Sequence, residues 1–398
     1  MYRNSISLFL CVIALTVTAQ RKVSTFYDVE RKVPKEVYFV IDHQQLGTVK
    51  HGFYKIWYPN QQLWQEGLYD YDKLDGNWLD YYEDGVLKQE LNYNKGMLDG
   101  QLLFYYPTGI LMQKADFKND KLDGTVINYF SNGTIQEIGT YSNGLLHGEL
   151  KSYYEDGKPR ILRTYKNGLE NGYSVTYFEN GNIRDRAFMK DGFPEGQYID
   201  YYKEFPNGTV NKICHYQAGR LHGKLTSFYP SGNVKYESTY NYDSIVGAVK
   251  EYYDSTKVVL KQTGTYKGNQ KWGSWRTYYV NGNVYTKGKY VNDLFDGEWI
   301  VNFPNGAIKH KGSFVEGKAT GEWEFYYETG ELKNKGKYLN DLKSGVWITY
   351  YKDGKVMTEI TFDNGQRNGM AKSYNKNGKL EEKVYYKNGE LQNRNKKK

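Results

Sequence analysis

A glycine that recurs every 24 residues constrains this chain more than any other feature of its sequence. The spacing is broken only by two short insertions and defines fourteen copies of one unit. The units open at Gly52, Gly76, Gly100, Gly124, Gly148, Gly172, Gly196, Gly223, Gly247, Gly273, Gly297, Gly321, Gly345 and Gly369. A fixed period of this length predicts an array of repeats that pack on their neighbours, rather than two or three compact domains.

Each unit carries the signals of two strands and two turns. The fifth and the sixth residue after the opening glycine are each aromatic in thirteen of the fourteen units, and an Asn-Gly or Asp-Gly pair follows in many of them, as at Asn281-Gly282. Such pairs accept the positive φ of a tight hairpin turn. The return segment then alternates with a period of two, as Val356, Thr358 and Ile360 do, which is typical of a strand.

The sequence therefore predicts an all-β protein, an elongated antiparallel β-meander or solenoid of about fourteen β-hairpin repeats over residues 51–391. Residues 20–50 precede the period, and their apolar run Glu36–Ile41 is expected to cap the first strand edge. Residues 392–398 form a polar basic tail. The array is irregular at 203–271, where we expect a tolerated loop insertion, with a bend or a docking point as the alternative.

Residues 1–19 differ from the rest, because Arg3 is their only charge and an apolar run extends from Leu8 to Val17. This pattern predicts a signal peptide cut after Ala19, and hence export to the periplasm, the outer surface or the medium. The run is too short for a transmembrane helix. Cys11 lies inside the run, so we expect no lipid anchor, and Cys214 then remains as a single cysteine without a disulfide partner.

Charge and candidate chemical groups argue against several function classes. The net charge is +8, but Lys and Arg alternate with Asp and Glu, so we do not expect nucleic acid as a partner. Carboxylates recur before the opening glycines, as at Asp75 and Asp296, yet equal positions lie roughly 10 Å apart across two strands. Metal ligands at about 2.0–2.6 Å cannot bridge that distance. We therefore expect no catalytic residue, no metal, no cofactor and no enzyme activity.

Four consecutive units place tryptophan two residues after the opening glycine. Strand parity predicts that these tryptophans share a face with the second aromatic residue of the pair, such as Phe303. The favoured interpretation is that the indoles cover the sheet's own aromatic row. The alternative is a binding platform for a glycan or an extended peptide. The candidate ligand-binding residues are Trp275, Trp299, Trp323, Trp347, Tyr279, Tyr327 and Tyr351.

The motif Gly-x-Trp-x-x-Tyr-Tyr-x-Asn-Gly, followed by Gly-x-Tyr and a second turn, recurs in register, for example over 321–338 and 345–362. It resembles the bacterial variant of the MORN repeat (membrane occupation and recognition nexus). The resemblance covers about residues 51–391 and implies a β-sheet used for protein or membrane contact, with no catalytic residues to transfer. Some bacterial relatives carry an antitoxin label, which fits an exported chain poorly.

The resulting hypothesis is an exported, non-enzymatic repeat scaffold that mediates protein–protein or envelope-surface interaction, with peripheral membrane contact among its modes. An envelope glycan- or peptidoglycan-binding module is the alternative, and an antitoxin-like binding protein a lesser one. No transmembrane helix is expected after signal cleavage.

Overall fold

The computed structural model describes residues 19–204 and 208–392 of the chain. Over these residues the protein is all β without a helix, so the predicted β-meander of hairpin repeats is confirmed. No helix in this part of the chain is long and apolar enough to cross a membrane. The predicted signal peptide and most of the basic tail lie outside the described residues.

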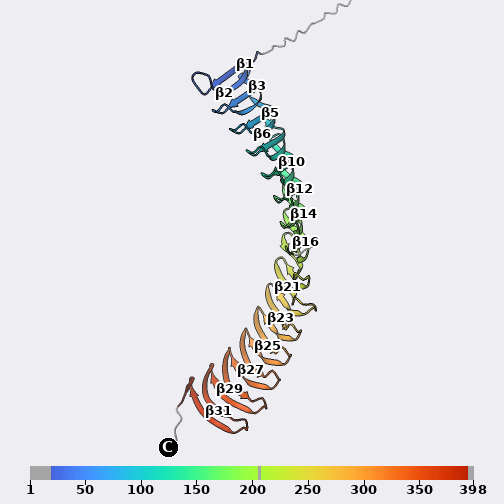
Figure 1. The fold of residues 1–398 in the computed structure, drawn as a ribbon. Coiled ribbons are helices and arrows are strands. Elements are labelled where there is room, and N and C mark those ends of the chain that lie inside the picture. Colours follow the sequence, from blue (N-terminus) through green and yellow to red (C-terminus); the bar gives the residue numbers. More distant parts are fainter. Residues whose placement is uncertain (1–18, 205–207, 393–398) are drawn as a thin grey trace, which may run out of the picture. The chain divides into compact units, whose positions relative to one another are not determined.

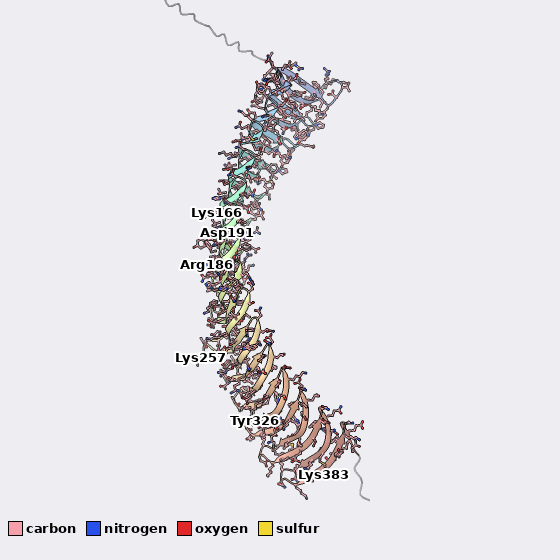
Figure 2. The ribbon with its side chains drawn as sticks, turned by 180° about the vertical axis from the view of Figure 1, so that it is seen from behind. Lys166, Arg186, Asp191, Lys257, Tyr326 and Lys383 are labelled. Carbon is pink, nitrogen blue, oxygen red and sulfur yellow. The ribbon has the colours of Figure 1, made fainter. Side chains whose placement is uncertain are left out.

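The described residues divide into two compact units with a boundary between Gly181 and Asn182, a division that the sequence did not predict. Within each unit the strands form one layer, and side chains project from both of its faces (Figures 1 and 2). Within each unit, strands that follow one another in the chain pair antiparallel, except that β7 and β8 both pair with β6, and β18 and β19 both pair with β17.

The first unit contains fourteen described strands. They are β1 (Arg21–Phe26), β2 (Pro34–His43), β3 (Gly47–Trp57), β4 (Leu63–Asp70), β5 (Lys73–Tyr81), β6 (Leu87–Asn94), β7 (Met97–Leu98), β8 (Gly100–Tyr105), β9 (Leu111–Lys118), β10 (Lys121–Tyr129), β11 (Ile135–Ser142), β12 (Leu145–Tyr153), β13 (Pro159–Lys166) and β14 (Leu169–Tyr177). The short β7 and the following β8 both pair with β6.

The second unit continues the pattern with nineteen described strands. They are β15 (Ile183–Lys190), β16 (Phe193–Tyr201), β17 (Val210–Gln217), β18 (Arg220–Leu221), β19 (Gly223–Phe228), β20 (Val234–Asn241), β21 (Ser244–Tyr252), β22 (Leu260–Lys267), β23 (Gln270–Tyr278), β24 (Val284–Val291), β25 (Leu294–Asn302), β26 (Ile308–Val315), β27 (Lys318–Tyr326), β28 (Leu332–Leu339), β29 (Leu342–Tyr350), β30 (Val356–Asp363), β31 (Gln366–Tyr374), β32 (Leu380–Lys387) and β33 (Glu390–Leu391).

The two turns of a repeat differ, and the first differs from its prediction. At the end of β23, Tyr279 N donates to Asn283 O over 2.8 Å and Gly282 N to Tyr279 O over 2.9 Å. Positive φ falls on Gly282 (+88°) and not on Asn281. The loop is therefore a three-residue connection closed by a glycine bulge, not a two-residue Asn-Gly turn. The second turn does match the two-residue form, with positive φ at both Asn292 and Asp293.

The opening glycine lies at a bulge inside a strand. The pairing of β24 with β25 shifts between Lys287 and Lys289, where the segment around Gly297 carries additional residues. Gly297 has φ +72°, a conformation that residues with a Cβ rarely adopt. The recurrence of this bulge explains why every repeat opens with glycine, since the bend must be made at the same place each time.

At the N-terminal end, the apolar run Glu36–Ile41 lies within β2, which pairs with both β1 and β3. Val40 and Ile41 are buried. The strand exposed at the edge of the first unit is therefore the short β1, which begins with Arg21 and Lys22. Charged residues and short length are common protections for such an edge.

Candidate functional site

The structure buries all four candidate tryptophans. The exposed fractions of Trp275, Trp299, Trp323 and Trp347 are 3%, 8%, 7% and 6%. The indole Nε1 of Trp275 donates to Thr265 O over 3.2 Å, and Trp299 and Trp347 make the equivalent bond to the previous strand. Trp323 is the exception, because its Nε1 is buried without an acceptor.

Each tryptophan lies over a glycine of the preceding strand. A Cβ added to Gly264, Gly288, Gly312 or Gly336 would lie 2.1–2.3 Å from an indole carbon of the next strand's tryptophan. Repeats without tryptophan carry a side chain at the glycine's position in most cases, such as Ala115 opposite Val126. The indole therefore occupies both its own position and the space that a side chain on the facing residue of the preceding strand would take. Sequence reasoning missed this pairing, although the Gly-then-Trp spacing of eleven residues recurs in all four cases.

The rings that lie nearly perpendicular to Trp275 come from the return strands on either side of it. Trp275 lies between Tyr266 and Tyr290, at centroid distances of 5.3 and 5.8 Å and nearly perpendicular to both. The same edge-to-face order continues through Trp299, Trp323 and Trp347. Edge-to-face pairs of this kind stabilise a sheet by about 0.5–1.5 kcal/mol each beyond burial.

Lysine side chains cover part of this aromatic row. Lys271 Nζ lies 4.6 Å from the ring centroid of Trp275, and Lys343 Nζ lies 4.2 Å from that of Trp347. Burial beside Trp347 and the nearby charge of Arg367 lower the pKa of Lys343. Lysines of the chain itself therefore make cation–π contacts with the rings of Trp275 and Trp347.

The three candidate tyrosines serve the next repeat. The hydroxyls of Tyr279, Tyr327 and Tyr351 donate to the backbone oxygens of Asn302, Tyr350 and Tyr374, respectively, over 2.8–3.0 Å. The same bond recurs from Tyr58, Tyr82, Tyr106, Tyr154, Tyr202, Tyr229 and Tyr253. Among the described residues, the ring contacts of the four tryptophans do not include these tyrosines, and Tyr279 lies against Tyr285 instead.

The four indoles are thus buried beside the rings of neighbouring strands, and the three tyrosine hydroxyls bond to the next repeat. The geometry leaves little indole surface for a ligand, because glycine backbone lies under one ring face and neighbouring rings lie at the edges.

The recurring carboxylates hold turns. Lys95 N donates to Asp75 over 3.1 Å, and Asn143 N donates to Asp123 over 3.2 Å. Asp296 instead pairs with Lys289 at 3.1 Å. Since a carboxylate accepts hydrogen bonds from backbone N–H groups well, these positions have a structural use. Within the described ranges, no three His, Cys, Asp or Glu side chains gather to hold a metal ion.

A thiol and an imidazole also lie among packed residues, the thiol of Cys214 fully buried and the imidazole of His310 partly buried. Cys214 is buried, and burial raises the pKa of its thiol, which makes it a poor nucleophile. His310 lies against Trp323 and Phe325, at centroid distances of 6.2 and 5.5 Å, and burial lowers the pKa of its imidazole.

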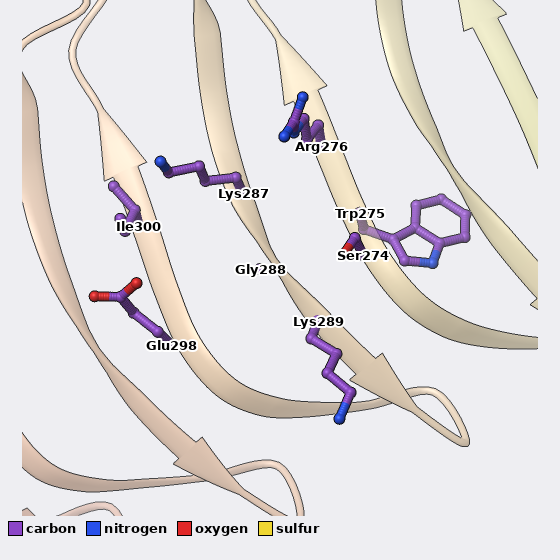
Figure 3. Close-up of a pocket in the computed structure, with 8 residues that line it drawn as sticks. All are labelled: Ser274, Trp275, Arg276, Lys287, Gly288, Lys289, Glu298 and Ile300. Carbon is purple, nitrogen blue, oxygen red and sulfur yellow. The ribbon is translucent and has the colours of Figure 1, made fainter.

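The opposite face of the second unit is charged and open. We call it the charged face, formed by the residues that alternate with the tryptophans along β23 to β29. Figure 3 shows a shallow hollow there, between β23, β24 and β25, with Trp275 directed away from the charged groups. Its volume is about 280 Å³, and its lining includes Ser274, Arg276, Lys287, Lys289, Gly288, Glu298 and Ile300.

The family described as MORN repeat variant matches the chain eight times. The matched residues are 74–95, 98–119, 122–143, 146–167, 221–242, 319–340, 343–364 and 367–388. No curated protein matches the sequence.

Solved structures with a detectable likeness belong to much larger chains. The crystal structure of TcdB2–TccC3 is 12% identical, with 94% of this chain and 23% of that chain covered and a TM-score of 0.16. A structure of the Photorhabdus luminescens Tc holotoxin pore is 14% identical, with 93% and 19% covered and a TM-score of 0.16. This chain thus spans about a quarter or less of those chains, and a likeness of this size indicates neither function nor partner.

Proposed function

Because the chain belongs to the MORN repeat variant proteins, we propose that it is an exported, non-enzymatic interaction scaffold that binds a protein of the cell envelope. MORN repeats are protein- or membrane-interaction repeats, so binding through a sheet face is the activity that the family supports. The finer assignment to an exported protein ligand is our proposal.

The difference between the two faces of the second unit carries this proposal. One face is filled by the tryptophans, their partner rings and the lysines above them. The charged face offers side chains of both signs, such as Glu322, Glu324 and Lys335, in a regular cross-strand order. Protein surfaces recognise such patterns through complementary charge, which supplies specificity and orientation.

The predicted non-enzymatic role is supported by the use of the reactive groups. The recurring aspartates and tyrosines are engaged in bonds that join strands and repeats, and the thiol of Cys214 is buried. Export is supported by the apolar run Leu8–Val17 before Ala19.

Retention of envelope material on the immobilised chain tests the proposal. Columns carrying the purified protein would be challenged in parallel with an envelope protein extract, peptidoglycan, envelope polysaccharide and lipid vesicles. We expect saturable retention of defined proteins that weakens with salt, since exposed charges are screened within about 8 Å at physiological ionic strength. Retention of the glycan fractions or vesicles alone would contradict the proposal and favour the glycan-binding or membrane-contact alternative.

Secretion is tested separately. The chain would be expressed in a Gram-negative host with and without residues 1–19, and fractions would be probed for the protein. Cytoplasmic recovery of the complete chain would argue against export.

A further inference from the structure

One pair of like charges stands directly opposed on the charged face. Arg276 on β23 and Lys287 on β24 are register partners across the ladder. Like charges at opposed positions destabilise a sheet, because their side chains are about 4.5–5.5 Å apart at Cβ. Among the residues that the structure describes, no carboxylate forms an ion pair with either side chain.

Arg276 and Lys287 belong to a row of register partners that runs across the strands, and elsewhere in this row several opposed pairs have opposite charges. Glu237 is opposed to Lys250, and Glu324 to Lys335. The other like-charged pair, Lys372 and Lys383, is relieved by Glu359, whose carboxylate lies 2.9 Å from Lys372 Nζ. Arg276 and Lys287 instead have Thr263 and Ile300 as their outer neighbours in the row. Unlike Lys372 and Lys383, the pair therefore has no carboxylate as a register neighbour in this row.

The pair lines the hollow of about 280 Å³ described above, in which Ser274 adds a hydroxyl donor, whereas the ammonium of Lys289 is paired with Asp296. In Figure 3 the side chains of Arg276 and Lys287 extend from adjacent strands, and Lys287 is directed towards β25, which carries Ile300 and Glu298. Two cations, a hydroxyl and an open concave surface form a receptor for a carboxylate, which an arginine fork binds with two parallel hydrogen bonds.

We propose that Arg276 and Lys287 form the docking site for an acidic segment of the partner protein, whose carboxylates enter the hollow. The inference rests on the proposed function and names the chemistry of the ligand. A long polyanion fits this surface less well, because it would meet Glu298 within the hollow and Glu322 and Glu324 on β27 beyond it. A peptide with acidic residues flanked by neutral or basic ones matches the sign changes of the face.

Binding of a defined peptide tests the site. The probe is a fluorescein-labelled Gly/Ser peptide with two adjacent aspartates, and its control has asparagines in their place. We expect saturable binding of the aspartate peptide by fluorescence polarisation, no binding of the asparagine peptide, and loss of affinity with added salt. Absence of binding by the aspartate peptide would overturn the inference.

Two double variants with the same change in net charge distinguish the effect of this site on binding from the effect of overall charge. Arg276→Gln/Lys287→Gln is expected to weaken binding at least about tenfold, the effect of losing one charge-assisted contact. Lys372→Gln/Lys383→Gln makes the same change in net charge on the same unit, and is expected to leave affinity within about twofold of the wild type. Arg276→Lys keeps the charge without the fork and should give an intermediate loss.

The melting temperature provides a second reading. Removing like charges should leave the Arg276→Gln/Lys287→Gln protein at least as stable as the wild type, so a binding loss would not come from unfolding. Equal weakening by the two double variants would refute the site, as would tighter, variant-sensitive binding of dextran sulfate. If envelope proteins are retained but the aspartate peptide is not, only this inference fails; if the wild type retains none, the proposed function fails.

Discussion

Adding one methyl group at Gly288 should displace the indole of Trp299. A Cβ at Gly288 would lie 2.2 Å from Trp299 Cδ2, about 1.2 Å short of the 3.4 Å at which ordinary contact begins. The ladder of β24 and β25 fixes both backbones, so the indole must leave its position. Overpacking costs about 1–3 kcal/mol, and full loss of a buried tryptophan about 3–5 kcal/mol. We expect Gly288→Ala to cost about 2–4 kcal/mol, between these limits.

Gly139 offers a matched control, because it occupies the same repeat position without a tryptophan above it. Its added Cβ would meet the flexible ends of Leu150 and Leu146 at 3.0 and 3.1 Å. Neither Gly139 nor Gly288 has positive φ, so backbone strain does not enter. We expect Gly139→Ala to cost less than about 1.5 kcal/mol.

Hydrogen exchange of the strand amides is the suitable assay, since repeats can open locally and a single global free energy is not defined. The double variant Gly288→Ala/Trp299→Val recreates the pair found at Ala115 and Val126. In that background the added methyl group should cost nothing further. Equal losses for the two glycine variants, or additive losses in the double variant, would refute the reasoning.

Three other groups give smaller tests. Tyr351→Phe removes the bond to Tyr374 O and should cost about 1 kcal/mol, visible as faster amide exchange in the two repeats concerned; unchanged exchange would contradict it. Partial burial lowers the pKa of the His310 imidazole, so the unfolded state binds more protons, and the stability present above about pH 6.5 should fall as the pH drops towards the folded value; a His310→Gln protein with the same pH profile would exclude this residue as the cause. The thiol of Cys214 should react with a disulfide reagent only after unfolding, because its pKa is raised by burial; rapid labelling of the folded protein would show that it is accessible.

The repeat, the two strands per repeat and the all-β class could be predicted because they follow from period and alternation. The first turn was harder, since Asn281-Gly282 suits both a two-residue turn and a three-residue loop with a glycine bulge. Neighbouring hydrogen bonds decide between these forms, and dipeptide composition does not.

The candidate site shows a different limit. Strand parity placed Trp275 and Tyr279 on one face, but parity within one strand does not identify the rings that neighbouring strands bring against Trp275. The true ring partner of Trp275, Tyr290, comes from the return strand and could be identified only once the register was known. The opposed Arg276–Lys287 pair likewise depends on that register.

The tyrosine bonds between repeats have a direction. In each of them the hydroxyl belongs to the earlier repeat and the carbonyl to the later one, and Asn281 and Asn305 donate in the same sense along that edge. The two ends of the repeat array are therefore not equivalent. Loss of the last repeat takes the acceptor from a tyrosine hydroxyl such as that of Tyr351, whereas loss of the first repeat takes the donor from a backbone carbonyl. The array therefore has a direction. Removing its last repeat takes the hydrogen-bond acceptor from the tyrosine of the repeat before it, whereas the tyrosines of earlier repeats keep their acceptors.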